Sequence, residues 1–320
     1  MEHTVRAIDT VTVFGGATLD CIVRSHAAPV MGASNPGSVR RVPGGVGFNV
    51  AAVLARLGMR TRLVTAVGAD PDGQAILAAA AAAGVDTSPV VVSEASATAA
   101  YHATLDDQGN LIIGIADMGI CDEVTPAAVA GSTKAGGRDF WVVDANLPKA
   151  TLAFLSAEAK DARVPIAALT VSPAKAVRLG PILDALTYLF TNRREAAALL
   201  GRDPEDSGLA VDALARELAG TRPTSIVVTN GNDPLAVASK GAVRSHASLR
   251  AMVKSVNGAG DSFAAGAIYG LAAGHDLNDA VRFGRAAAVL TLEAGGIADA
   301  PFGEDALAER LTAGPARVAS

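Results

Sequence analysis

The stretch KSVNGAGDSFAAGA, residues 254–267, places Gly-Ala-Gly directly before a carboxylate, Asp261, and a run of small residues that predicts a helix. Each glycine held in an ordered segment costs about 0.5–1 kcal/mol relative to alanine, and such a run is typical of places where the backbone approaches a ligand. The N–H groups of a first helical turn lack partners inside the helix, and with the helix dipole they form an anion site. We therefore predict that Gly258, Ala259 and Gly260 bind an oxyanion or a phosphate group.

Asp261, at the start of this predicted helix, has two interpretations. As a structural residue it would cap the helix and interact with its dipole. As a functional residue it would act as a general base beside the anion site and take a proton from an attacking hydroxyl. The local sequence alone leaves both open.

Elsewhere, short apolar runs rich in β-branched residues alternate with Ala- and Leu-rich segments. Strands are expected at residues 11–14, 62–67, 140–143, 165–170, 187–191 and 225–229, and helices at 72–83, 193–200, 208–219 and 277–294, with another ended by Gly58. Continuous apolar runs are typical of parallel strands that are covered on both faces. The alternation predicts an α/β fold with a doubly wound, mainly parallel sheet flanked by helices.

Residues 97–105 break this pattern, because apolar and polar residues alternate there with a period of two. DDQGN at 106–110 reads as a turn, and LIIGIAD at 111–117 follows it, which predicts a hairpin. We predict one domain over residues 1–320, with a small β-sheet lid formed from about residues 18–40 and 96–117. The exposed edge of such a lid predicts a homodimer through its strands.

Composition excludes several classes of protein. The net charge of −5 gives no electrostatic footprint for nucleic acid. Cys21 and Cys121 lack the spacing of a metal site or disulfide framework. The N-terminus carries acids and no sustained apolar core, so we expect no signal peptide there. The apolar runs fall short of the ~18 residues of a membrane span. We expect a cytoplasmic protein that binds neither nucleic acid nor membranes.

A second glycine-rich stretch, PGGVGFNVAAVLARLG at 43–58, also precedes a helix. Gly45 and its small neighbours would let a polyhydroxylated ligand lie against the backbone, with Asn49 as donor and acceptor; the alternative is a tight turn with an Asn cap. Asp20 could bind a pair of vicinal hydroxyls, or it could be a solvated loop acid.

The stretch TNRREAAALL at 191–200 places Asn192 and Glu195 on one face of a helix start. This pattern predicts either a capping box or a water-mediated Mg²⁺ site. The chain has no GxxxxGK[ST] sequence, and Val50 stands where a dinucleotide motif needs its third glycine. These two features argue against a P-loop site and a nicotinamide site.

Together, GGVGFNVAAVLARLG with Gly68 further on, Asn192-x-x-Glu195 and NGAGD resemble, in this order from about residue 10 to 300, the signature regions of the PfkB (ribokinase-like) sugar and nucleoside kinases. The resemblance implies a ribokinase-like fold and ATP-dependent, Mg²⁺-assisted phosphorylation of a primary hydroxyl. It implies that Asp261 is the catalytic base and that Gly258–Gly260 form the anion hole. Phosphoryl transfer depends mainly on positioning and charge stabilisation, which agrees with these roles.

The same resemblance implies further roles. Asn192 and Glu195 would organise magnesium and phosphate, and Thr229 to Gly231 would lie near the nucleotide. The sugar would be held by Asp20, Gly45 and Asn49.

Within the family, SNPG at 34–37, YHATLDDQGNLIIGIADM at 101–118 and VSPAK at 171–175 are similar to pseudouridine kinases, which phosphorylate the 5′-hydroxyl of a C-nucleoside. This likeness makes Asn35, His102 and Asp117 candidates for contacts to the base or ribose, and Lys175 for the substrate or phosphate. The alternatives are a ribose, fructose or other nucleoside kinase, and a non-catalytic sensor.

Three departures from the family pattern limit these inferences. Ser255 stands where relatives often carry an acid and Asn257 where they carry a threonine, so the activating potassium site of relatives is not implied. Pro234 replaces a frequent glycine near the nucleotide, and Thr170 occupies a position where Asp is common.

Overall fold

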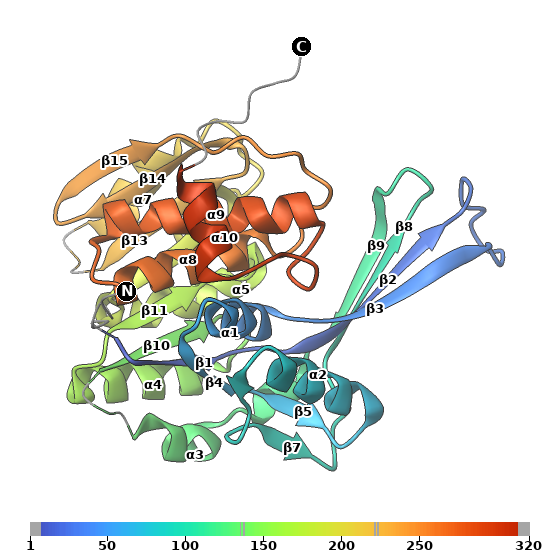
Figure 1. The fold of residues 1–320 in the computed structure, drawn as a ribbon, viewed down its shortest axis with the longest axis horizontal. Helices are drawn as coiled ribbons and strands as arrows, with labels where there is room; N and C mark the ends of the chain where they lie inside the picture. The colour runs from blue at the N-terminus through green and yellow to red at the C-terminus, as the bar shows by residue number, and fades with distance from the viewer. Residues whose placement is uncertain (1–7, 135, 137, 221, 223, 313–320) are drawn as a thin grey trace.

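The computed structural model describes residues 8–134, 136, 138–220, 222 and 224–312 (Figure 1). Residues 1–7, part of the stretch from which no signal peptide is expected, lie outside the described residues. The described helices include none that is both long and apolar enough to cross a membrane.

A nine-stranded sheet forms the centre of the molecule, in the order β15-β14-β13-β12-β11-β10-β1-β4-β6. Its strands from β6 to β13 are parallel, whereas β14 and β15 are antiparallel to their neighbours. The bounds are β1 Thr10–Phe14, β4 Arg60–Val64, β6 Val85–Asp86, β10 Asp139–Asp144, β11 Ile166–Leu169, β12 Tyr188–Asn192, β13 Ser225–Asn230, β14 Asp233–Ser239 and β15 Ala242–His246.

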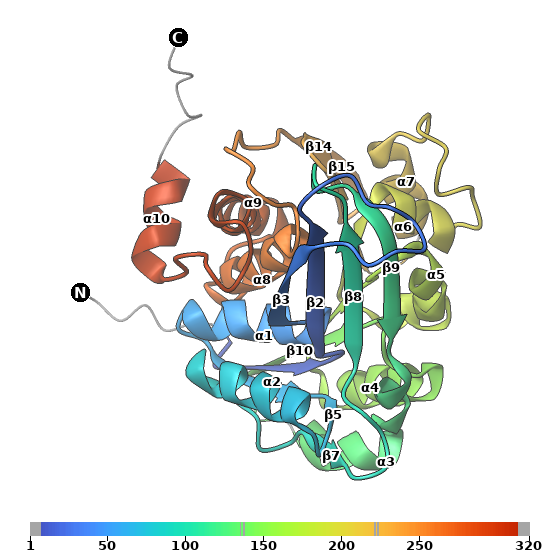
Figure 2. The same ribbon diagram turned by 90° about the vertical axis from the view of Figure 1, so that its right-hand side faces the viewer.

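Helices cover both faces of this sheet (Figures 1 and 2). One face carries α1 Val46–Arg56, α2 Pro71–Ala82, α8 Ala259–Ala272, α9 Leu277–Ala294 and α10 Glu304–Thr312. The other face carries α3 Pro126–Val129, α4 Lys149–Ala162, α6 Arg193–Leu199, α7 Val211–Ala219 and the 3₁₀ segments η1 Gly119–Glu123 and η3 Val177–Ala185. The short helix α5 Pro173–Ala176 follows β11, and the 3₁₀ segment η2 Ala130–Thr133 follows α3.

Strand residues divide between two hydrophobic cores according to the period of two. In β10, Phe140 and Val142 pack into the core with α1 and α8, while Trp141 and Val143 pack into the core with α4 and α7. Both faces are buried, which explains the continuous apolar runs. The predicted doubly wound, mainly parallel sheet flanked by helices is confirmed.

The run at residues 62–67, predicted as one strand, is two strands in different sheets. Arg60–Val64 is β4 of the central sheet, whereas β5, Ala66–Gly68, pairs with β7, Val91–Ser93. The chain changes partners at Thr65, whose carbonyl accepts from the N–H of Val91 at 2.9 Å. Hydrophobicity did not reveal the break, because the residues on both sides are buried.

A separate four-stranded sheet, in the order β3-β2-β8-β9, projects away from the body of the molecule (Figure 1) and presents one face in Figure 2. Its strands are β2 Thr18–Ser25, β3 Gly37–Gly44, β8 Ala100–Leu105 and β9 Leu111–Asp117. We call it the small sheet. It joins the body where β2 follows β1 and where β3 leads into α1, which brings it beside the carboxyl ends of the central strands.

Candidate active site

Asp261 and Asn49 come from two helices that pack against each other, α8 and α1. Asn49 Nδ2 donates a hydrogen bond to Asp261 Oδ2 at 2.7 Å. Helix α8 has no side-chain cap: its N-cap is Gly258, at φ 76°. Asp261, the third residue of the helix, therefore does not act as its cap. Its carboxylate lines a cavity.

The pKa of Asp261 is raised to about 7, chiefly because the carboxylate is desolvated by burial. The hydrogen bond from Asn49 lowers this pKa, and the negative charges of Asp144, Glu195 and Asp20 raise it. A carboxylate that titrates near neutral pH is suited to accept a proton during a reaction and to release it afterwards.

The glycines before Asp261 have different environments. A Cβ on Gly258 would lie 2.7 Å from Ile297 Cδ1, whereas a Cβ on Gly260 would meet no heavy atom within 4 Å. The N–H of Ala259 donates to the carbonyl of Val256 at 3.3 Å. Among the described residues no acceptor binds the N–H groups of Gly260 and Asp261. The N–H of Gly258 likewise has no acceptor among the described residues, so the amides available to an anion are those of Gly258, Gly260 and Asp261, whereas that of Ala259 is bonded.

The cavity beside Asp261 has a volume of about 220 Å³ and lies at the carboxyl ends of β11, β12 and β13. Ligands of open α/β sheets bind at this end of the strands. We call it the Asp261 cavity; its polar lining consists of Thr170, Thr191, Asn192, Glu195, Thr229 and Asp261.

Asn192 and Glu195 form the capping box that the sequence allows. The N–H of Glu195 donates to Asn192 Oδ1 at 3.0 Å, and the N–H of Asn192 donates to Glu195 Oε2 at 3.3 Å. Thr170 Oγ1 donates to the same Oε2. Glu195 Oε1 accepts no hydrogen bond from a described residue and is not fully enclosed, so it is presented to the cavity. The helix cap and a contact to a hydrated cation are compatible.

The described residues include no group of three or more His, Cys, Asp or Glu side chains placed to hold a metal directly. A Mg²⁺ ion in this cavity would keep most of its waters, because Mg²⁺ dehydrates reluctantly and usually retains several waters in phosphate sites. The side chains that could contact its waters are Glu195 and Asn192.

Thr229 and Gly231 differ in position. Thr229, near the end of β13, lines the Asp261 cavity and donates from Oγ1 to the carbonyl of Thr191 at 3.3 Å. Gly231 lies in the turn between β13 and β14 at φ 60°, with open space around it and outside that cavity.

A larger cleft of about 870 Å³ lies between the small sheet and the loops at residues 253–258 and 295–298. We call it the lid cleft. Asp20 and Asn49 both line it, so the Asn49–Asp261 hydrogen bond joins the two cavities. Asp20 Oδ1 accepts from Thr18 Oγ1 at 2.7 Å, and burial raises the pKa of Asp20.

Glycines bring the backbone close at the base of this cleft. A Cβ on Gly44 would lie 2.4 Å from Asp20 Oδ2, so the carboxylate lies against bare backbone. Gly45, at φ 90°, is the N-cap of α1, and its Cβ would lie 2.7 Å from the carbonyl oxygen of Gly16. The small sheet is tied to the far rim by an exposed ion pair, Arg40 Nη2 to Asp299 Oδ2, at 3.0 Å.

Three predicted substrate contacts do not line either cavity. His102 pairs with Cys21, whereas Asp20 pairs with Tyr101, so the period of two places His102 on the outer face of the small sheet. Asn35 uses its side chain within its own loop, bonding Val30 and Ala33. Asp117 is exposed at the end of β9 and accepts from the N–H of Gly119 at 3.3 Å.

Lys175 lies on α5, outside both cavities, and donates from Nζ to Asn146 Oδ1 at 2.5 Å. Asp144 and Asn146, at the carboxyl end of β10, were not predicted. Asp144 is 1% exposed, and the signal for it was a lone acid directly after the apolar run FWVV. A polar residue at the carboxyl end of a buried parallel strand is a candidate site residue.

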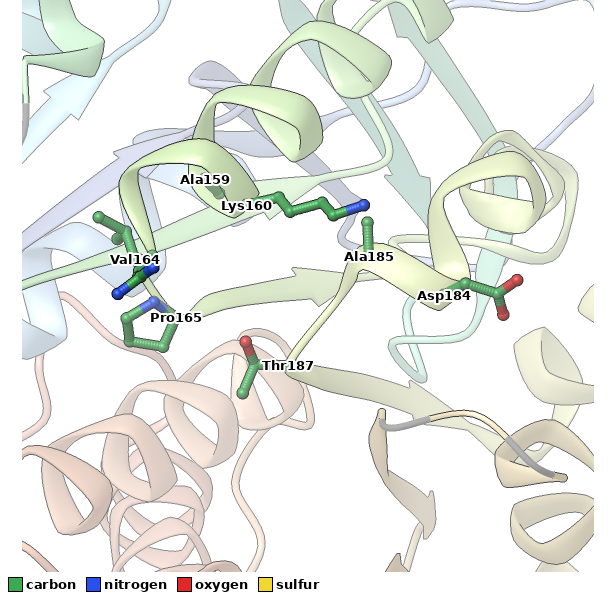
Figure 3. A pocket seen from close by; sticks show the side chains of 8 residues that line it. Ala159, Lys160, Val164, Pro165, Asp184, Ala185 and Thr187 are labelled. Atoms are coloured by element: carbon green, nitrogen blue, oxygen red, sulfur yellow. The ribbon is translucent and has the colours of Figure 1, made fainter.

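A pocket of about 530 Å³ at the opposite end of the strands contains none of these residues. Figure 3 shows its lining, with Pro165 and Thr187 just before β11 and β12. The candidate catalytic groups lie at the carboxyl ends of the strands, so we place the candidate active site there and not at this pocket.

Comparison with known proteins agrees with this geometry. The family model described as pfkB family carbohydrate kinase matches residues 9–302. Pseudouridine kinase of Escherichia coli K12 is 30% identical over 296 residues, which cover 90% of this chain and 92% of that protein. Ribokinase of Bacillus subtilis 168 is 30% identical over 294 residues, which cover 88% and 92%.

Solved structures share the fold. A carbohydrate kinase from Agrobacterium tumefaciens superposes with a TM-score of 0.82 at 33% identity, covering 96% of this chain and 98% of that one. A ribokinase from Arabidopsis thaliana, determined with ribose and ATP, superposes with a TM-score of 0.81 at 21% identity, covering 96% and 100%. At 21% identity, the similarity to the second structure supports the fold alone.

Proposed function

The chain belongs to the pfkB family of carbohydrate kinases, and we propose that it transfers the γ-phosphoryl group of ATP to the 5′-hydroxyl of pseudouridine. Membership makes the protein a phosphotransferase that acts on an alcohol group of a sugar or nucleoside. The choice of nucleoside is our inference. The observation that carries the phosphoryl transfer is the hydrogen bond from Asn49, which lines the lid cleft, to Asp261, which lines a separate cavity of polar residues.

In this proposal, the ribose lies in the lid cleft against Gly44, with its hydroxyls on Asp20 and Asn49. The 5′-hydroxyl then points toward Asp261, which takes its proton as the oxygen attacks phosphorus. A carboxylate with a pKa near 7 is matched to that step. The amides of Gly260 and Asp261, at the positive end of α8, stabilise the charge that develops on the transferring group.

The triphosphate of ATP lies in the Asp261 cavity, near Asn192 and Thr229. Mg²⁺, when bound through water to Glu195, supplies charge neutralisation on the phosphate oxygens. Thr170 holds that carboxylate through the oxygen that is not presented to the cavity. An acid is common in relatives at position 170, and here the hydroxyl of Thr170 supports Glu195 without adding charge.

Two observations support a nucleoside over a free pentose. The lid cleft, about 870 Å³, is larger than a pentose needs. Beyond Asp20 the inner face of the small sheet carries Tyr101 and Arg24, and the turn between β8 and β9 adds Gln108. This aromatic ring and these donors suit a base with carbonyl oxygens. The equal identity to a ribokinase makes ribose the second candidate.

The small sheet also supports the proposal of a homodimer. Its two edge strands, β3 and β9, are open, and β9 exposes Leu111, Ile113 and Ile115 at 56%, 53% and 60%. A second copy pairing there would cover both the edge and the apolar side chains. Sedimentation that finds only monomer at micromolar concentration would refute it. The cytoplasmic location and the absence of a nucleic-acid partner stay predictions.

The deciding experiment is ADP release with pseudouridine, uridine, adenosine, ribose and fructose, each with ATP and Mg²⁺. We expect kcat/KM to be highest with pseudouridine. Selective turnover of ribose or uridine would remove the pseudouridine assignment and keep the kinase. Binding of a nucleoside with no turnover of any compound would favour a sensor.

A further inference from the structure

Asp144 is a buried carboxylate, 1% exposed, to which the proposed mechanism assigns no task. Its Oδ2 accepts from the N–H of Gly16 at 2.8 Å, and its Oδ1 accepts from the N–H of Asn146 at 2.8 Å. A buried carboxylate persists only where hydrogen bonds and charges compensate its lost hydration. Here that compensation comes from the backbone of the turn after β1 and from its own strand end.

That turn, Gly15-Gly16, is pressed between Asp144 and helix α1. A Cβ on Gly15 would lie 2.4 Å from Asp144 Oδ2, and a Cβ on Gly47 would lie 2.7 Å from the carbonyl carbon of Gly15. On the far side, the N–H of Phe48 donates to the carbonyl of Gly16 at 3.2 Å. The backbone of Gly15-Gly16 is thus in direct contact with Asp144 on one side and with Gly47, in the first turn of α1, on the other.

Asn49, the residue after Phe48, donates to Asp261 from this same first turn. We propose that Asp144 is a positioning residue for phosphoryl transfer: by holding the Gly15-Gly16 turn against α1, it sets the place from which Asn49 orients Asp261. The inference rests on the proposed role of Asp261 as general base. Asp144 itself touches neither cavity.

The charge of Asp144 supports this placement. It raises the pKa of Asp261, after burial, as do Glu195 on α6 and Asp20 on β2, while the bond from Asn49 lowers it. Asp144 in turn faces Lys175 on α5 and Cys121 on η1, whose thiol has a pKa raised to about 12, chiefly by burial. Removing the charge of Asp144 should therefore lower the pKa of Asp261.

The test is Asp144→Asn, which keeps the shape, removes the charge and turns one acceptor into a donor that faces an N–H. We expect kcat with the best substrate to fall about 10- to 100-fold, as for a displaced catalytic group. The KM for ATP should change less than about threefold, because the nucleotide residues lie across the sheet at β12 and β13. The acid limb of kcat/KM should move to lower pH.

A second variant separates position from charge. Gly47→Ala pushes the same stack apart from the α1 side and leaves every charge in place. We expect a similar fall in kcat without the shift of the acid limb to lower pH; weakening of the Asn49 bond would move that limb to higher pH instead. Gly131→Ala is the matched control, because a Cβ there meets no heavy atom within 4 Å. It should match wild type.

The outcomes are distinguishable. The proposal is overturned if Asp144→Asn keeps kcat within about twofold, or lowers kcat and raises the KM for ATP alike with no pH shift. If Asp144→Asn does not fold, Gly47→Ala decides: unchanged kcat in that variant overturns the proposal. Activity retained by Asp261→Asn would instead refute the proposed base, whatever the result with Asp144.

Discussion

Asn49 and Asp261 lie 212 positions apart in the chain, and Asn49 Nδ2 is 2.7 Å from Asp261 Oδ2. The bond joins the first turns of α1 and α8, the helices that follow the two glycine-rich stretches. The sequence predicts each stretch separately as a ligand site. The structure brings them together, and one hydrogen bond thereby joins a residue of the lid cleft, Asn49, to a residue of the Asp261 cavity.

Replacing Asp261 with asparagine should lower kcat by about 10²- to 10⁴-fold, the usual contribution of a general base. Binding of the nucleoside should persist, because the introduced amide can still contact Asn49 and the cleft residues are unchanged. Single-turnover ADP formation together with calorimetric binding checks both parts. A variant with near-normal kcat would show that another group takes the proton.

The activity of the wild-type protein should rise with pH through about 7, because Asp261 must be deprotonated to act and its pKa is raised to about 7. In Asn49→Ala the acid limb should move to higher pH, since the hydrogen bond that lowers this pKa is lost. Profiles of kcat/KM between acid and mildly alkaline pH measure both. If the acid limb of the profile stays at the same pH in Asn49→Ala, the group that titrates there is not Asp261.

The same pKa shift should also appear in the stability of the fold. Because the folded pKa of Asp261 lies above its unfolded value, folding favours the protonated form, and stability is lost as pH rises from about 4 to 7. Asp261→Asn should therefore raise the Tm relative to wild type at pH ~8, and the difference should vanish at pH ~4. A difference in Tm that is equal at both pH values would contradict this.

Gly258→Ala should damage both stability and activity. An L-residue at φ 76° is strained by about 1 kcal/mol or more, and the new Cβ would lie 2.7 Å from Ile297 Cδ1. The first turn of α8 would shift, and with it the amides of Gly260 and Asp261. Gly303→Ala serves as the control, because no heavy atom lies within 4 Å of its Cβ position. Equal Tm and kcat in the two variants would show that the backbone at Gly258 does not constrain the first turn of α8.

Val171 holds a strained backbone at the wall of the Asp261 cavity, with φ 69°, and the N–H of Ser172 donates to the carbonyl of Thr170 at 2.8 Å across it. Val171→Gly should be more stable than Val171→Ala by about 1 kcal/mol, because both variants lose the packing of a partly buried valine and only glycine relieves the strain. At Val92, an exposed strand position, glycine should instead be less stable than alanine. Urea unfolding compares each pair, and a Val171→Gly variant no more stable than Val171→Ala would refute the strain.

The main sheet could be predicted because parallel strands bury both faces, so their apolar runs are visible without any partner. The faces of the small sheet could not. Tyr101 and His102 alternate, and only the pairing of β8 with β2 decides which of them shares the face of Asp20. Asp144 was missed for a related reason: its partners, at Gly16 and Asn146, are backbone N–H groups, which carry no signature in the sequence.

The loop at residues 297–299 has contacts in two directions, since Ile297 packs against Gly258 while Asp299 holds Arg40 of the small sheet. A chimera that carries the small sheet of another kinase would therefore lose the ion pair between residues 40 and 299 unless this loop is exchanged together with the sheet. A change of substrate specificity by segment exchange should therefore replace the small sheet and residues 297–299 as one unit.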